Sequence, residues 1–136
     1  MRKITHIAVH CTATSQTTRV EAIQRYWRET LKWRSPGYHY MIEANGRVHI
    51  LLPEDRVSNG VAGWNQRLIN VAYIGGVDQN NRPLDNRTPF QRQILLNILR
   101  ELKQRHPQAI IQGHRDFPNV KKDCPSFDAK REYAHL

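Results

Sequence analysis

The chain has 136 residues, a length that suits one domain over residues 1–136 with its own hydrophobic core. Its 21 Lys and Arg residues outnumber its 12 Asp and Glu residues, and the net charge of +9 favours an anionic partner: nucleic acid, a membrane surface or a bacterial wall. Two cysteines are too few for a disulfide scaffold, and no apolar run approaches the roughly 20 residues of a membrane-spanning helix, so no membrane insertion is expected.

The first thirty residues predict a buried strand and then a helix. Ile4 to Val9 is a short apolar run, so we expect a central strand with His10 at its end. Thr18 and Glu21 have the spacing of a capping box, and apolar residues follow at helical intervals, which predicts a helix to about Leu31. The N-terminus is basic but lacks the apolar segment of a secretory signal. A role outside the cell would therefore need lysis or dedicated export.

The middle of the chain predicts a hairpin and another buried strand. Residues 38–42 alternate between two faces, Asn45-Gly46 marks a turn, and residues 48–52 return with the same alternation. A further buried strand is expected over residues 69–77. In the ordered loop between these strands, Trp64 and Asn65 are candidate substrate-binding residues that could line a groove. The alternative is that the tryptophan pins the loop to the core.

The last third predicts a long helix, a strand and a short helix. Thr88 and Gln91 form a second capping box around a proline, and this helix should end before Pro107. Residues 109–112 should form a strand that delivers His114, and residues 127–133 a final helix. The order of elements indicates an α/β domain, with a single mixed central β-sheet flanked by helices on both sides.

Three residues are candidate ligands of one zinc ion. His10 ends the first expected strand, His114 follows the last one, and Cys124 comes ten residues later. Neutral imidazole and thiolate are good zinc ligands, and three protein ligands with one open position are typical of a catalytic zinc. Spacing alone leaves two alternatives open, namely satisfied structural histidines and a disulfide between Cys11 and Cys124. The competing histidines are His6, His39, His49, His106 and His135.

Two further residues suit the hydrolysis of an amide or ester at such a site. Lys122 lies two residues before Cys124, so in an extended chain it points to the same side as that ligand. A cation there would stabilise the oxyanion of a tetrahedral intermediate. Tyr38 is a second candidate, since a phenol can donate to the oxyanion or orient water. Cys11 follows His10 on a strand and should point the opposite way, into the core.

Six segments in order closely resemble the type 2 N-acetylmuramoyl-L-alanine amidases, above all the phage lysozyme-amidases, which are relatives of the peptidoglycan recognition proteins. The resemblance covers almost the whole chain. The segments are Val9-His10-Cys11-Thr12-Ala13-Thr14, Gly37-Tyr38-His39-Tyr40, Gly63-Trp64-Asn65, Tyr73-Ile74-Gly75-Gly76-Val77-Asp78, Gly113-His114-Arg115-Asp116 and Cys124-Pro125-Ser126-Phe127-Asp128.

The resemblance implies a zinc hydrolase that cuts peptidoglycan between N-acetylmuramic acid and the L-alanine of the stem peptide. The family's zinc ligands fall on His10, His114 and Cys124, its catalytic tyrosine on Tyr38 and its catalytic lysine on Lys122. In one departure, many relatives have a histidine just before the Ala-Gly of the mid-chain loop, where this chain has Val61. The implied protein is a monomer that acts on the bacterial cell wall after lysis or export.

Two other functions remain as alternatives. A related fold could bind peptidoglycan without cutting it, but such relatives typically lose the cysteine ligand, and Cys124 is present here. The high positive charge also fits a nucleic-acid-binding protein, although the chain has no recognised binding motif and no continuous basic stripe. A regulatory protein partner stays open as well, because some phage amidases of this type bind and inhibit an RNA polymerase.

Overall fold

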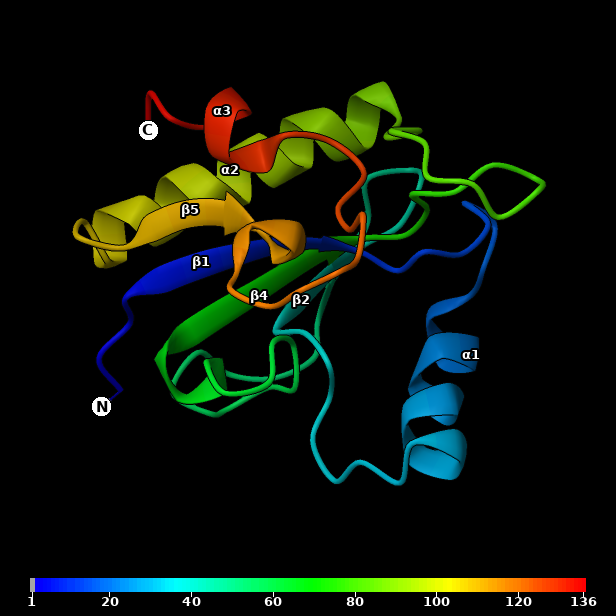
Figure 1. The fold of residues 1–136 in the computed structure, drawn as a ribbon, viewed down its shortest axis with the longest axis horizontal. Helices are drawn as coiled ribbons and strands as arrows, with labels where there is room; N and C mark the ends of the chain where they lie inside the picture. Colours follow the sequence, from blue (N-terminus) through cyan, green and yellow to red (C-terminus); the bar gives the residue numbers. More distant parts are fainter. Residues whose placement is uncertain (1) are drawn as a thin grey trace.

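The computed structural model describes residues 2–136 and contains one five-stranded sheet (Figure 1). The strand order is β3-β2-β4-β1-β5, in which β3 alone runs antiparallel to its neighbour. The strands are β1 (His6–Cys11), β2 (Tyr40–Ile42), β3 (Val48–Ile50), β4 (Leu68–Tyr73) and β5 (Ile110–Gly113). The helices are α1 (Val20–Arg25), which continues as a π-helical turn (Tyr26–Thr30), α2 (Pro89–Arg105) and α3 (Ala129–Glu132). Short 3-10 turns cover Asn65–Arg67 and His114–Asp116.

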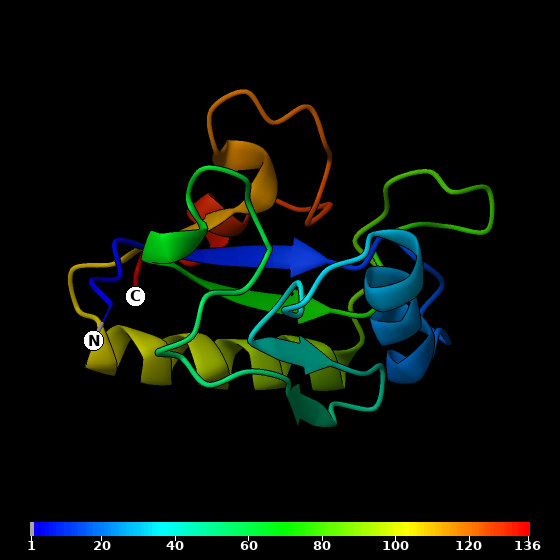
Figure 2. The ribbon, with the colours of Figure 1, turned by 90° about the horizontal axis from the view of Figure 1, so that it is seen from below.

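The predicted layers are confirmed, with helices on both faces of one mixed sheet. Alternate residues of β1 point to opposite faces, so Ile7, Val9 and Cys11 enter the main core between the sheet and α2, while His10 points to the other face. Figure 2 shows α2 below the sheet and the segment that carries His114, in orange, above it. On this upper face, Trp27 of the π-helical turn after α1 packs in a cluster with Met41 of β2.

The parallel strands bring the candidate ligands to one edge of the sheet. Val9 of β1 pairs with Gly113 of β5, so the residues that follow each of them, His10 and His114, lie side by side. Parallel strands end at the same edge, and side chains at that edge are fixed by the strands but open to ligands. The sheet therefore explains how two histidines 104 positions apart in sequence meet.

Several element boundaries differ from the predictions. Thr18 is not the cap of α1: the cap is Arg19, which makes no side-chain capping bond, because Thr18 belongs to a preceding turn in which its N–H donates to the Ser15 carbonyl. The predicted strand over residues 69–77 ends at Tyr73, because Gly75 and Gly76 adopt positive φ angles of 139° and 96° that turn the chain out of the sheet.

Other local predictions are confirmed. The capping box of α2 has both reciprocal bonds, from the Gln91 N–H to Thr88 Oγ1 over 3.1 Å and from the Thr88 N–H to Gln91 Oε1 over 3.0 Å. The turn at Asn45-Gly46 joins β2 to antiparallel β3, although β3 ends at Ile50 rather than Leu52. Within residues 2–136, no helix has both the length and the apolar character needed to cross a membrane.

Candidate metal centre

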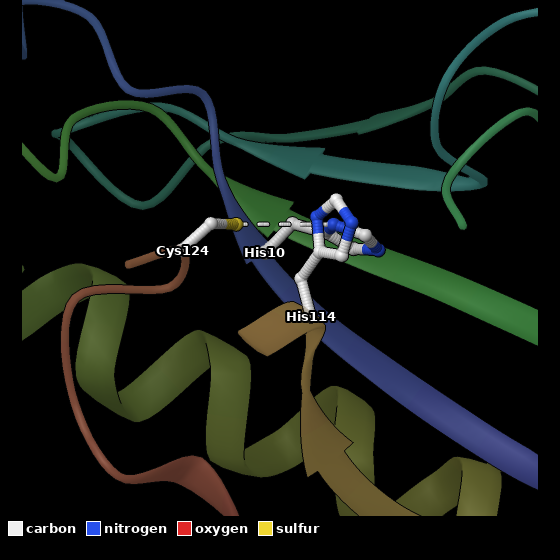
Figure 3. A group of neighbouring side chains, drawn as sticks. All are labelled: His10, His114 and Cys124. Carbon is white, nitrogen blue, oxygen red and sulfur yellow. Dashed lines mark hydrogen bonds between the residues drawn. The ribbon is translucent and has the colours of Figure 1, made fainter. Parts of the chain in front are cut away.

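His10, His114 and Cys124 converge on one point above the sheet (Figure 3). One potential ligand atom from each lies within 4.8 Å of the other two, and among residues 2–136 this is the one group of at least three such side chains. His10 Nδ1 and Cys124 Sγ lie 3.9 Å apart. Two ligands of a tetrahedral zinc lie about 3.5 Å apart, as zinc–ligand bonds of about 2.0 to 2.3 Å require. The separation of His10 Nδ1 and Cys124 Sγ is therefore close to that expected of two ligands of one zinc ion.

His10 is a buried side chain with a defined orientation. It lies in the run of buried residues in β1, directly before the last strand residue, Cys11, and is 1% exposed. Its Nε2 lies 2.8 Å from the Oδ1 of Asn70 on β4, which leaves Nδ1 on the side of Cys124. Burial, together with the nearby His114 and Lys122, lowers the pKa of His10 to about 3. The imidazole is therefore neutral at physiological pH, as a metal ligand must be.

His114 begins the 3-10 turn that follows β5. The Gly113 N–H donates to the Asp116 carboxylate over 2.9 Å, which fixes this turn. The His114 and His10 ring centroids are 4.8 Å apart. Burial and the charge of Lys122 lower the pKa of His114 to about 4, so both imidazoles are neutral near pH 7.

Cys124 is held against the end of β1 by backbone contacts. Its Sγ accepts a hydrogen bond of 3.1 Å from the Cys11 N–H, and its carbonyl accepts one of 2.8 Å from the Arg115 N–H. A Cβ at Gly113 would lie 2.6 Å from Cδ of Pro125, so the close approach of this segment to β5 requires glycine there. Burial raises the pKa of the Cys124 thiol, and a bound cation would reverse that shift.

The disulfide alternative is wrong, because both cysteines are free thiols. Cys11 points into the core as expected and is 4% exposed. Three of the competing histidines have other contacts. His39 is buried and hydrogen-bonded to the Arg56 carbonyl, while His49 and His106 contact glutamate carboxylates.

Tyr38 and Lys122 lie beside the three candidate ligands. The Tyr38 ring centroid is 5.1 Å from that of His10, and its hydroxyl makes a long contact of 3.4 Å with the Cys11 carbonyl. Burial, reinforced by the neighbouring Cys124 and Cys11 sulfur atoms, raises the pKa of Tyr38 well above its usual range, so the phenol stays protonated. Lys122 is exposed and lines the hollows on both sides of the centre.

Two hollows meet at the candidate centre, and both are lined by Trp33 and Lys122. The larger, of about 750 Å³, reaches His114, and the other, of about 660 Å³, reaches Tyr38. The remaining lining of the first mixes polar and apolar residues, namely Asn59, Gly60, Val61, Ala62, Trp64, Asn65, Pro118, Asn119, Val120 and Lys121. That of the second includes Tyr26, Trp27 and Leu31. The centre therefore lies where a long substrate could extend in two directions.

Trp64 and Asn65 line the larger hollow, but their side chains also hold its loop together. Trp64 packs edge-on against His6 and Phe117, with ring centroids 5.2 and 5.3 Å away. Asn65 Oδ1 accepts hydrogen bonds from the Gly60 and Val61 N–H groups. A contact with substrate remains a prediction for both residues.

Two residues near the candidate centre were not predicted from sequence, namely Asn70, which contacts His10, and Ser58, which contacts Asn70. Asn70 is a fully buried polar residue in the middle of β4, and Ser58 is equally buried in the neighbouring loop. The sequence signal for this contact was Asn70 itself, a polar residue inside an otherwise apolar strand, because buried polar groups need specific partners.

Comparisons with known proteins identify the family and the fold of the chain. The sequence profile of the N-acetylmuramoyl-L-alanine amidase family matches residues 1–127. An endolysin of Klebsiella phage KP32 is 37% identical over 131 residues, covering 96% of this chain and 85% of the phage protein. Among solved structures, the Ph2119 endolysin of a Thermus scotoductus bacteriophage matches with a TM-score of 0.79 at 25% identity, covering 92% of this chain and 79% of that one. Bumblebee PGRP-SA shares the fold, with a TM-score of 0.80 at 14% identity over 100% of this chain and 83% of that one.

Proposed function

The chain belongs to the N-acetylmuramoyl-L-alanine amidase family, and from this premise we propose that it is a zinc-dependent peptidoglycan hydrolase. It cleaves the amide between the lactyl group of N-acetylmuramic acid and the L-alanine of the stem peptide. One zinc ion per chain is held by His10, His114 and Cys124. The observation that carries the proposal is the convergence of these three donors between two hollows. The protein acts as a monomer on the bacterial wall.

The donor set fits zinc in a catalytic rather than a purely structural role. Two neutral imidazoles and one thiolate are the ligands that zinc prefers, and three of them leave a coordination position for a reactant. Bound there, zinc would supply Lewis acidity toward the scissile carbonyl and make a water molecule more acidic. The protein's part is to keep His10 and His114 unprotonated, which their burial does.

Tyr38 and Lys122 act on the charge that develops during hydrolysis. Water adds to the carbonyl carbon, the carbonyl oxygen becomes an oxyanion, and the amide nitrogen leaves with a proton as the amine of L-alanine. The Tyr38 phenol remains protonated and its present contact of 3.4 Å is long, so its O–H is available to the oxyanion. Lys122 adds a positive charge at the junction of the hollows.

The two hollows support a substrate that extends to both sides of the scissile bond. Each hollow has polar and aromatic lining, with Asn59, Asn65 and Trp64 in the larger one and Thr12, Tyr26 and Trp27 in the smaller one. A muramyl peptide has a polar glycan on one side of the scissile bond and a peptide on the other. The net charge of +9 adds a general attraction to the anionic wall.

Metal removal tests the zinc dependence. The protein is treated with a chelator, dialysed, and assayed on a suspension of purified peptidoglycan before and after zinc is restored. We expect turbidity to fall only with the zinc-loaded protein. Full activity in chelated protein of verified low zinc content would contradict the proposal. Sedimentation with peptidoglycan in the absence of any hydrolysis would instead indicate a binding module.

A further inference from the structure

Four polar side chains form a buried line that starts at His10 and runs away from the candidate metal position. His10, Asn70, Ser58 and His39 are each at most 1% exposed. His10 Nε2 lies 2.8 Å from Asn70 Oδ1, Asn70 Nδ2 lies 2.7 Å from Ser58 Oγ, and Ser58 Oγ lies 3.1 Å from His39 Nδ1. Complete burial makes an unsatisfied group in this line costly, so each hydrogen bond must have a matched donor and acceptor.

Backbone groups set the direction of these bonds. The Arg56 carbonyl can only accept, and it lies 2.7 Å from His39 Nε2, so that nitrogen carries a proton. The Asn70 backbone N–H can only donate, and it lies 3.0 Å from His39 Nδ1, so that nitrogen is an acceptor. Arg2 Nη2 is also near His39 Nε2, at 3.2 Å, but it is a donor as well and donates to the Glu54 carbonyl instead. His39 is therefore neutral and protonated on Nε2.

The remaining bonds are compatible with that assignment. Asn70 Nδ2 donates to Ser58 Oγ, and the Ser58 hydroxyl hydrogen faces His39 Nδ1, where it shares the single lone pair with the Asn70 backbone N–H. The Asn70 amide is thereby oriented with Oδ1 toward His10, and a carbonyl oxygen can only accept. His10 Nε2 therefore carries the proton, and the lone pair of His10 Nδ1 is left on the side of Cys124.

We infer that Asn70, held by Ser58 and His39, is a positioning residue that fixes the His10 ring and the tautomer in which Nδ1 binds the metal. The inference rests on the proposed function, since it assigns a role toward the proposed zinc. Metal-bound histidines commonly donate their second ring N–H to a neighbouring acceptor, and losing that acceptor typically costs about 10–100-fold in metal affinity.

Packing around Asn70 leaves its amide little freedom. A Cβ at Gly60 would lie 2.1 Å from Asn70 Oδ1, so the loop backbone covers the amide directly. The same loop forms a wall of the larger hollow, through Asn59, Gly60 and Val61. The wall of the hollow and the orientation of the metal ligand therefore depend on the same buried contacts.

Zinc affinity tests the inference without relying on activity. Zinc binding is measured by competition with a chromophoric chelator for the wild type and for Asn70→Leu, Asn70→Asp and Ser58→Ala. The absorption spectrum of the cobalt(II)-loaded proteins reports the geometry of the thiolate-containing site. Gln91→Leu is the matched control, because Gln91 is an equally buried amide that bonds to the Ile42 and Ile74 carbonyls on the other face of the sheet.

We expect Asn70→Leu to weaken zinc binding by about 10–100-fold and to alter the cobalt spectrum, because it removes the acceptor. Asn70→Asp keeps an acceptor for His10 Nε2–H and should bind zinc nearly as tightly as the wild type. Ser58→Ala should weaken binding several-fold by releasing the amide, and Gln91→Leu should leave affinity unchanged even if it lowers the melting temperature.

A folded Asn70→Leu variant with wild-type zinc affinity and cobalt spectrum would overturn the inference. If that variant does not fold, Ser58→Ala decides, and unchanged affinity there has the same meaning. Equal weakening in Gln91→Leu would also overturn it, since general destabilisation would then explain the effect. A wild-type protein that binds no zinc would reject the proposed function itself, a different result from a zinc-binding wild type with unaffected variants.

Discussion

The Cys11 backbone N–H donates a hydrogen bond of 3.1 Å to Cys124 Sγ, although 113 residues separate the two cysteines in sequence. The Cys11 side chain points the other way, into the core, where a Cβ on Gly76 would lie 2.4 Å from its Sγ. One cysteine therefore contributes its backbone to the candidate centre, and the other contributes its sulfur. Mutation of each cysteine can test these two different roles.

Cys124→Ala should lose both zinc and hydrolytic activity, because it removes one of the three proposed ligands. Cys11→Ala should keep both, since the backbone N–H remains, although loss of a buried side chain should lower its melting temperature. Elemental analysis of the purified variants gives the zinc content per chain. Full zinc occupancy in Cys124→Ala would show that the ligand assignment is wrong.

Tyr38→Phe should bind zinc normally and lose turnover by about 10²-fold or more, the scale of a lost oxyanion donor. The ring is kept, so packing against Trp27 and His10 is retained. Tyr26→Phe is the control, because Tyr26 lines the same hollow but is 53% exposed, whereas the Tyr38 ring packs against His10. Equal rates for Tyr38→Phe and the wild type at saturating substrate would remove the phenol from the mechanism.

Lys122→Met should also retain zinc and lose about 10²-fold or more in turnover, because it removes the cation at the junction of the hollows. Lys121→Met is matched in charge and sequence position, but Lys121 lines only the larger hollow and should matter much less. The two rates are compared on the same peptidoglycan preparation. If both variants lose activity equally, the effect comes from net charge rather than from the position of Lys122.

Glu54 should make stability depend on pH in the acid range. Burial raises the pKa of its carboxyl group, but hydrogen bonds from Arg105, Tyr40 and His106 outweigh burial and lower the pKa from 4.5 to about 2. A lowered pKa in the folded state stabilises the fold above pH 4.5, and this contribution is lost as the pH falls toward about 2. The melting temperatures of metal-free wild type and Glu54→Gln should therefore differ most near neutral pH and converge in acid. A difference that stays constant with pH would contradict this role.

The meeting of the two candidate histidines was predictable because each lies beside a feature that local sequence describes well. His10 follows an apolar run, and His114 follows a short strand, so a parallel sheet brings both to one edge. The predicted layers followed from the same alternation of apolar residues along each strand. The capping box of α2 was predictable as well, since all of its bonds lie within four consecutive residues.

The buried line behind His10 could not be derived from local sequence. Asn70 contacts His10 and Ser58, which lie 60 and 12 residues away, and its role appears only when three segments pack together. The prediction that Thr18 caps α1 was wrong for a similar reason. A capping box is a local preference, and here the turn formed with Ser15 prevails over it.

Mass spectrometry of purified peptidoglycan after incubation with the zinc-loaded protein tests the proposed reaction most directly. The proposed reaction releases stem peptides with a free L-alanine amino group and leaves glycan strands intact, and the Cys124→Ala variant provides the blank. Undigested peptidoglycan, with the protein folded and zinc-bound, would contradict hydrolysis. Cleavage within the glycan or inside the stem peptide would contradict the assignment of the bond.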